Sequence, residues 1–336
     1  MKQSIQTTIL FFIAVAAPAV LPAQTSVGGV AYAQYVYQLE DTANHVNGFD
    51  VTRAYVNLLG KFSGGVSTRI TADIYRQAGD NSLRYRLKYA FVGYAPAHSP
   101  FTFKIGQIQT PWIDFEEALW DYRMQGTVAL DRNGYMSSSD FGAGVDGKWG
   151  NDRINASTAL LNGEGYSGGT GDQRKDFGTR VSVRVRATDD SSRTGGLRVT
   201  GYAQIGKPTS GGIRQRFAGL VSYRSSRFTL AAELAATTDS VTATPVAETH
   251  GRVISVFGVY HLAGTKASAI ARYDVVDPNT TAANDRLSRV IVGLSYQLSP
   301  NLRILADVDQ LSYQGTPSAA QNAVRSQAAF RAQFAF

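Results

Sequence analysis

A two-residue alternation of apolar and polar side chains recurs along this chain in segments of strand length. In the segment 83–95, for example, Arg84, Arg86 and Lys88 share one face, and the alternate positions are apolar or aromatic. No segment shows convincing helical periodicity. The pattern predicts sixteen strands, bounded by residues that favour turns, at 29–39, 50–62, 65–76, 83–95, 101–109, 140–149, 152–162, 177–187, 196–206, 214–224, 227–237, 252–262, 266–276, 287–298, 301–312 and 323–336.

The connections between these strands alternate in length. Short turns are expected at 63–65, 96–100, 150–152, 225–226, 263–266 and 299–301, with a somewhat longer one near 188–195. Longer loops fall between them at 40–49, 77–82, 110–139, 163–176, 207–213, 238–251, 277–286 and 313–322. Short turns on one side and longer loops on the other are typical of outer-membrane barrels, whose two termini lie on the short-turn side. We therefore expect an all-β fold, a transmembrane antiparallel β-barrel of about 16 strands.

The N-terminal residues 1–23 have the features of a cleavable secretory signal peptide. Lys2 supplies the charged start, a short apolar run follows, and Ala23 is a small residue at a plausible cleavage site. An N-terminal membrane helix is the alternative, but the apolar run is short for a span. The barrel is then expected to occupy residues 24–336. The chain has no cysteine and a formal charge of +7, which on its own is weak support for an anionic partner.

The C-terminal segment AVRSQAAFRAQFAF, residues 323–336, has one aromatic and one polar face. Phe330, Phe334 and Phe336 alternate with positions that include Arg331. In a barrel this last strand pairs with the first, so that no strand edge is left open, and its aromatic face lies in lipid. The terminal Phe336 resembles the C-terminal aromatic signal by which the barrel-assembly machinery recognises outer-membrane proteins.

Three stretches, in order over about residues 49–190, resemble the phosphate-selective porin family of Gram-negative outer membranes, the porin O and P type. The first two are FDVTRAYVNLLGKF at 49–62 and FTFKIGQIQTPWIDFEEALW at 101–120, which contains Gly106, Gln107 and Pro111. The third is ALLNGEGYSGGTGDQRKDFGTRVSV at 159–183. The resemblance implies a sixteen-stranded, usually trimeric channel in the outer membrane, with a preference for phosphate or polyphosphate.

The loop at 110–139 is the longest connection and the third on the long-loop side. Loops of this length without predicted structure are usually functional, and in general porins the third extracellular loop folds inward and narrows the pore. We expect an inward-folded constriction loop, whose charged residues include Asp114, Glu116, Glu117, Asp121 and Arg123. A solvated surface loop is the alternative.

Cationic residues recur on the polar faces of the predicted strands. If these faces line the lumen, they select permeant ions by sign. The residues expected to line the pore are Arg53, Arg69, Arg84, Arg86, Lys88, Lys104, Arg180, Arg184 and Arg186. We therefore expect a porin for passive diffusion of small hydrophilic solutes that favours anions such as phosphate. The alternative is a weakly selective general porin, in which loop acids opposite wall bases create a transverse field.

Other classes of function have less support. The four histidines, His45, His98, His250 and His261, suggest neither a Ser–His pair nor a metal site by their spacing. The glycine-rich stretch 163–171 lacks the Lys-Ser/Thr end of a phosphate-binding loop. We expect no enzyme activity, no cofactor and no nucleic-acid partner. An adhesin or structural barrel is a further alternative, and outer-membrane lipid and lipopolysaccharide are the expected surroundings.

Overall fold

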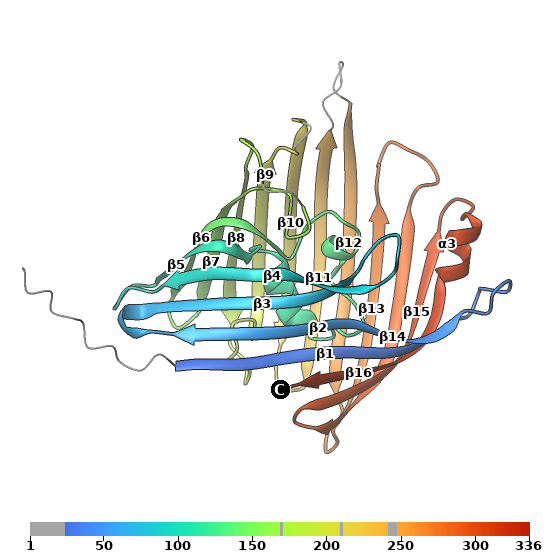
Figure 1. Ribbon diagram of the computed structural model, residues 1–336, viewed down its shortest axis with the longest axis horizontal. Coiled ribbons are helices and arrows are strands. Elements are labelled where there is room, and N and C mark those ends of the chain that lie inside the picture. Colours follow the sequence, from blue (N-terminus) through green and yellow to red (C-terminus); the bar gives the residue numbers. More distant parts are fainter. Residues whose placement is uncertain (1–23, 169–170, 209–210, 241–246) are drawn as a thin grey trace, which may run out of the picture.

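A computed structural model describes residues 24–168, 171–208, 211–240 and 247–336. In these residues sixteen antiparallel strands form a closed barrel, in which each strand pairs with its sequence neighbours and β1 pairs with β16 (Figure 1). The expected barrel is thus confirmed. The predicted signal peptide, residues 1–23, lies outside the described residues.

All sixteen predicted strands are present, with boundaries that differ by five residues or fewer. The strands are β1 Gln24–Gln38, β2 Asn47–Lys61, β3 Val66–Arg76, β4 Leu83–Tyr94, β5 Phe101–Gln109, β6 Ser139–Trp149, β7 Ile154–Leu161, β8 Asp176–Arg186, β9 Gly196–Gly206, β10 Ile213–Arg224, β11 Phe228–Ser240, β12 Glu248–His261, β13 Ala267–Asp277, β14 Leu287–Ser299, β15 Leu302–Tyr313 and β16 Ser326–Ala335.

The expectation that the chain has no helix was wrong. α1 (Ile113–Trp120) and α2 (Ala129–Arg132) lie in the long third loop, and α3 (Ala319–Val324) lies in the last one. A 3-10 turn, η1 (Ser63–Gly65), joins β2 to β3. These elements are shorter than the window of about 11–18 residues in which helical periodicity can be recognised. None of the described helices is long and apolar enough to cross a membrane.

The barrel has an apolar outer face and a polar inner face, as the alternation predicts. On β16, Phe330 and Phe334 are about half exposed on the outside, whereas Arg331 is buried inside. Arg331 donates hydrogen bonds to Asp307 on β15 and to Gln34 on β1. This cation therefore ties together the three strands at which the ring closes.

A β-bulge on β4 changes the predicted facing of its second half. Thr71 pairs with Tyr89 but Ala72 pairs with Leu87, so Lys88 is the extra residue. A bulge places two successive side chains on one side of the strand. As a result Tyr89 is buried inside the barrel, where the alternation predicted a lipid-facing ring. Phe91 also departs from the prediction and packs against an inner cluster of Ile108, Ala159 and Leu161.

Candidate functional site

The third long loop, residues 110–138, lies inside the barrel. Its apolar side chains, including Trp112, Phe115 and Trp120, are almost completely inaccessible to solvent. The helix α1 contacts β11 and β12, and α2 contacts β12 (Figure 1). The expected inward fold is therefore present, and a solvated surface loop does not describe this segment.

Aromatic contacts attach the loop to the wall opposite its origin. The ring centres of Trp112 and Tyr202 (β9) lie 5.5 Å apart, and those of Trp120 and Phe257 (β12) lie 5.3 Å apart. The Trp112 Nε1–H donates a 2.9 Å hydrogen bond to Glu233. Because apolar burial is joined here to directed hydrogen bonds, the loop has a defined position.

Arginines of the wall hold successive backbone carbonyls of the loop. Arg180 donates to the Pro111 carbonyl at 3.0 Å and stacks on Phe115, with 4.3 Å from its guanidinium carbon to the ring centre. The other donor–carbonyl pairs are Arg193 to Asp114, Arg224 to Ala118, Arg303 to Asp121, Arg272 to Thr127 and Arg216 to Tyr135. These contacts attach the loop to the barrel between β8 and β15.

Two cavities lie between the loop and the opposite wall. The outer cavity, about 390 Å³, is lined by Arg53, Arg76 and Arg331 on the wall and by loop residues 123–126. The inner cavity, about 320 Å³, is lined by Tyr32, Tyr55, Arg69, Lys88 and Tyr89 on the wall, and by Asp114, Glu117, Asp121 and Arg123 on the loop. Arg123 lines both cavities.

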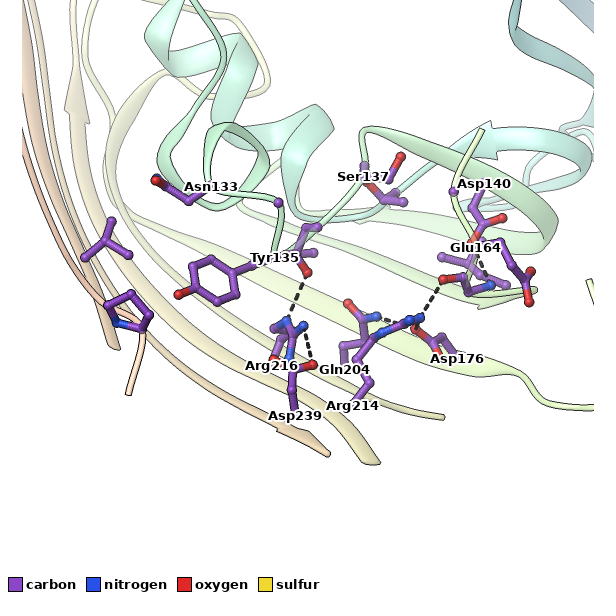
Figure 2. A pocket seen from close by; sticks show the side chains of 18 of the residues that line it. Asn133, Tyr135, Ser137, Asp140, Glu164, Asp176, Gln204, Arg214, Arg216 and Asp239 are labelled. Carbon is purple, nitrogen blue, oxygen red and sulfur yellow. Dashed lines mark hydrogen bonds and ion pairs between the residues drawn. The ribbon is translucent and has the colours of Figure 1, made fainter. Parts of the chain in front are cut away.

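A third cavity, about 590 Å³, lies on the other side of the loop, between residues 133–137 and the long-loop ends of the wall strands (Figure 2). Arg216 bridges the Tyr135 carbonyl and Asp239, and Arg214 bridges Asp176 and the Gly163 carbonyl. The cations of this cavity are therefore engaged in attaching the loops to the wall.

Charges in the outer and inner cavities are unequal. Seven cationic side chains and four carboxylates line them. Within the described part of the chain, no ion pair joins Arg69 or Lys88 to a carboxylate. Arg69 donates to Thr71 and Asn57 and lies over the Tyr89 ring, while the Lys88 ammonium donates to the Tyr55 hydroxyl at 3.2 Å. Two cations without an ion-pair partner among the described residues therefore line the inner cavity.

The other predicted wall cations lie in different surroundings. Arg53 and Arg86 approach Asp73 at 3.6 and 3.7 Å, and Arg86 also donates to the Tyr166 hydroxyl at 2.9 Å. Lys104 pairs with Asp146 at 2.6 Å. Arg84 is exposed at the rim of the barrel and pairs with Asp80.

Three predicted pore residues require correction. Arg180 lies beneath the loop, which covers this part of the inner face. Arg184 donates to the Asn151 carbonyl at the short-turn end, and Arg186 is an exposed residue at the last position of β8. The alternation identified the inward face of β8 as far as Arg184, but it carries no information about which inward residues a loop will cover.

The loop acids also separate into two groups. Asp114, Glu117 and Asp121 line the inner cavity, and each pairs with an arginine: Arg193 at 2.6 Å, Arg123 at 2.8 Å and Arg303 at 3.1 Å. Glu116 belongs to the same loop but faces the wall and is fully buried, and its carboxylate oxygens have no hydrogen-bond partner among the described residues. It does not line the inner cavity, because α1 turns it towards β11.

Sequence reasoning missed several lining residues. Tyr32, Tyr55 and Tyr89 line the inner cavity together with Arg193, which belongs to a turn, and Gln333, which belongs to β16. The only signal for Arg193 was the unusual length of the turn at 188–195. The alternation does place Tyr55 on the same face as Arg53, but it gives no reason to expect a ring at the constriction, and the facing of Tyr89 depends on the bulge.

One Ser–His contact was not predicted from spacing. His261 Nδ1 lies 2.8 Å from Ser268 Oγ, and the two residues are directly paired across β12 and β13. Within the described residues no ion pair reaches His261, so the carboxylate of a catalytic triad is missing. No group of three or more potential metal ligands occurs in the described residues either.

Comparisons with known proteins agree with this architecture. The sequence model of the family described as "Phosphate-selective porin O and P" matches residues 27–267. A search of curated proteins found no significant match.

Solved structures with similar folds include the anion-selective porin from Comamonas acidovorans, with 11% identity, coverage of 94% of this chain and 100% of that chain, and a TM-score of 0.67. The outer membrane channel DcaP of Acinetobacter baumannii has 11% identity, coverage of 94% and 97%, and a TM-score of 0.67. A loop-deletion mutant of OmpT from Vibrio cholerae has 13% identity, coverage of 94% and 99%, and a TM-score of 0.66.

Proposed function

Because the chain belongs to the phosphate-selective porin O and P family, we propose that it lets small hydrophilic anions such as phosphate cross the outer membrane by passive diffusion. The chain is an outer-membrane porin, with a closed sixteen-stranded barrel and an inward third loop. Solutes follow their concentration gradient through the outer and inner cavities. The anion preference of the porin from Comamonas acidovorans, stated in its name, is in line with this proposal.

The observation that carries the anion preference is the pair of uncompensated cations at the inner cavity. In the described part of the chain, the hydrogen-bond partners of Arg69 and Lys88 are neutral groups, whereas each loop acid at this cavity has an arginine partner. Charged rings at a narrow, partly desolvated site select ions by sign. The field along the path is therefore positive on balance.

A weakly selective general porin is the second candidate. It is favoured by the arrangement of Glu117, Asp114 and Asp121 on the loop opposite Arg69 and Lys88 on the wall, which is that of a transverse field. The arginine partners of the three acids weaken that field on the loop side. An adhesin has less support, since the longest loop lies inside the barrel.

Reversal potentials in planar bilayers distinguish the two candidates. In a potassium chloride gradient, the anion-favouring porin gives stepwise conductance. Its reversal potential is shifted towards the equilibrium potential of chloride. Phosphate added to the chloride solution then lowers the chloride current, whereas a neutral solute at the same concentration does not. A reversal potential near zero supports the weakly selective porin, and silent membranes contradict both.

The assembly and export of the chain belong to the same proposal. A homotrimer is supported by a neighbour described as a trimer form, OmpT of Vibrio cholerae. Recognition by the barrel-assembly machinery rests on the aromatic end of the chain, where Phe336 pairs with Gly29 of β1. Export would use the signal peptide at 1–23, and lipopolysaccharide would surround the outer rim.

A further inference from the structure

The connection between β8 and β9, residues 187–195, is the longest on the short-turn side. Its shape is fixed by contacts with the neighbouring strands. Asp190 pairs with Arg224 of β10 at 2.7 Å, and Arg198 of β9 donates to the Gly195 carbonyl at 3.0 Å. Thr194 is buried. The turn is therefore a structured element at the short-turn end of the barrel.

The turn brings one cation to the constriction loop. Arg193 donates from one guanidinium nitrogen to the Asp114 carboxylate at 2.6 Å and from the other to the Asp114 backbone carbonyl, also at 2.6 Å. Both residues line the inner cavity together with Lys88. Burial raises the pKa of Asp114, but the charge and the hydrogen bond of Arg193, together with the charges of Lys104 and Arg180, outweigh it and hold this pKa below its usual range. Asp114 is thus a charged group that needs its partner.

Arg303 of β15 makes the same two contacts with Asp121, the residue that follows α1. It donates to the Asp121 carboxylate at 3.1 Å and to the Asp121 carbonyl at 2.6 Å. Two loop acids are therefore each held by a guanidinium that contacts carboxylate and backbone at once. Such paired contacts fix both the charge balance and the position of the loop edge.

We propose that Arg193 is a selectivity-determining residue, which the turn 187–195 carries into the barrel to cancel the charge of Asp114 at the inner cavity. This inference rests on the proposed anion-favouring porin. Without Arg193, an unmatched carboxylate lines the cavity that Arg69 and Lys88 also line, and the net positive charge of the cavity is reduced. Arg193 acts on permeant ions through Asp114, so it is a positioning and charge-balancing residue.

Four variants test this inference by reversal potential in a potassium chloride gradient: Arg193→Gln, Asp114→Asn, the double variant, and Arg227→Gln as control. Arg227 is an exposed cation on the same short-turn side and forms no ion pair with the residues that the structure describes. We expect Arg193→Gln to lower the chloride-to-potassium permeability ratio at least about twofold, because a unit charge at this range is weakly screened. Arg227→Gln should change the ratio less.

The double variant decides between charge and position. Cancellation predicts that Arg193→Gln with Asp114→Asn returns the ratio to that of the unmodified porin, even if conductance or noise differs. A ratio that stays low in the double variant overturns the inference, since Arg193 then acts only by holding the loop. An unchanged ratio in Arg193→Gln overturns it as well. If the unmodified porin itself lacks anion preference, the proposed function fails instead.

Discussion

The inward-facing cations of this barrel carry the same charge but have different interaction partners. Arg69 and Lys88 face the inner cavity with neutral hydrogen-bond partners, and Arg180 holds the backbone of the loop. Arg193 pairs with a loop acid. The bulge that places Lys88 beside Tyr89 makes this arrangement possible, because both side chains then point inward. We therefore expect selectivity to depend on the partner of each cation rather than on the number of cations.

Replacement of both unpaired cations tests this argument. In the variant Arg69→Gln with Lys88→Gln, we expect the chloride-to-potassium permeability ratio to fall at least about threefold, because two uncompensated charges leave the narrow site. Reversal potentials in a potassium chloride gradient measure the ratio. The control is Arg84→Gln, which removes a rim cation already paired with Asp80. An equal effect of the rim variant would contradict the assignment.

Glu116 gives a prediction for pH dependence. Burial raises its pKa well above the usual range, and the neighbouring carboxylate of Glu233 raises it further. When the pKa of an acid is higher in the folded than in the unfolded state, its contribution to stability is fully present at pH values below the unfolded-state pKa. This contribution is lost as the pH rises through the folded-state pKa. Glu116 is therefore expected to hold α1 on the wall when protonated and to loosen it when ionised.

Single-channel recordings from about pH 6 to about pH 10 measure this effect. We expect closures or current noise to increase at the alkaline end in the unmodified porin and to stay constant in Glu116→Gln, which mimics the protonated acid. The same alkaline increase in Glu116→Gln would show that another group is responsible.

The constriction loop is a folded element attached to the wall from β8 to β15. Aromatic rings, side-chain hydrogen bonds and arginine–carbonyl contacts follow one another along it. The Tyr122 hydroxyl lies 2.6 Å from Ser295 Oγ, and the Gln125 amide donates to Asp309 at 3.0 Å. The inward position of the loop therefore follows from its contacts with the strands it covers.

Trp112→Phe tests one of these attachments. The variant keeps an aromatic ring near Tyr202 but leaves the Glu233 carboxylate without its indole donor. Loss of a buried hydrogen-bond partner costs about 1–3 kcal/mol, so we expect more frequent loop fluctuations, measured as current noise and as entry of larger sugars into liposomes. Trp149→Phe, on the outer face beside Phe101, is the matched control. Equal behaviour of the two variants would contradict the role of Trp112.

The whole molecule was more predictable than its site. The strand order, the alternation of short and long connections and the facing of Phe330, Phe334 and Arg331 follow from period and turn residues. The short helices in the loops were missed, because they are attached to the wall by tertiary contacts. The covered face of Arg180 and the wall-facing side of Glu116 depend on where the loop packs, and a single sequence has no signal for that.

Barrel closure gives a prediction at this scale. Arg331 joins β16 to Asp307 on β15 and to Gln34 on β1. Removal of one partner from a buried ion pair costs about 3–5 kcal/mol, because the other charge stays buried. Arg331→Met should therefore lower the temperature at which the folded barrel loses its fast electrophoretic mobility. The control Arg325→Met, which removes a partly exposed pair with Glu40, should change it less. A reversed order would contradict the closure role.

We propose that ions pass between the loop and the β1–β4 wall through a positive constriction. The most direct measurement uses Ala118→Cys, a small residue of α1 that lines the inner cavity, in a chain without cysteine. The rates at which anionic and cationic methanethiosulfonate reagents change the current through this variant report both access and sign. Each rate is divided by the rate at which the same reagent modifies a free thiol in solution. We predict that the anionic reagent then modifies the cysteine faster than the cationic reagent. Faster modification by the cationic reagent, or none by either, would contradict a positive constriction on this path.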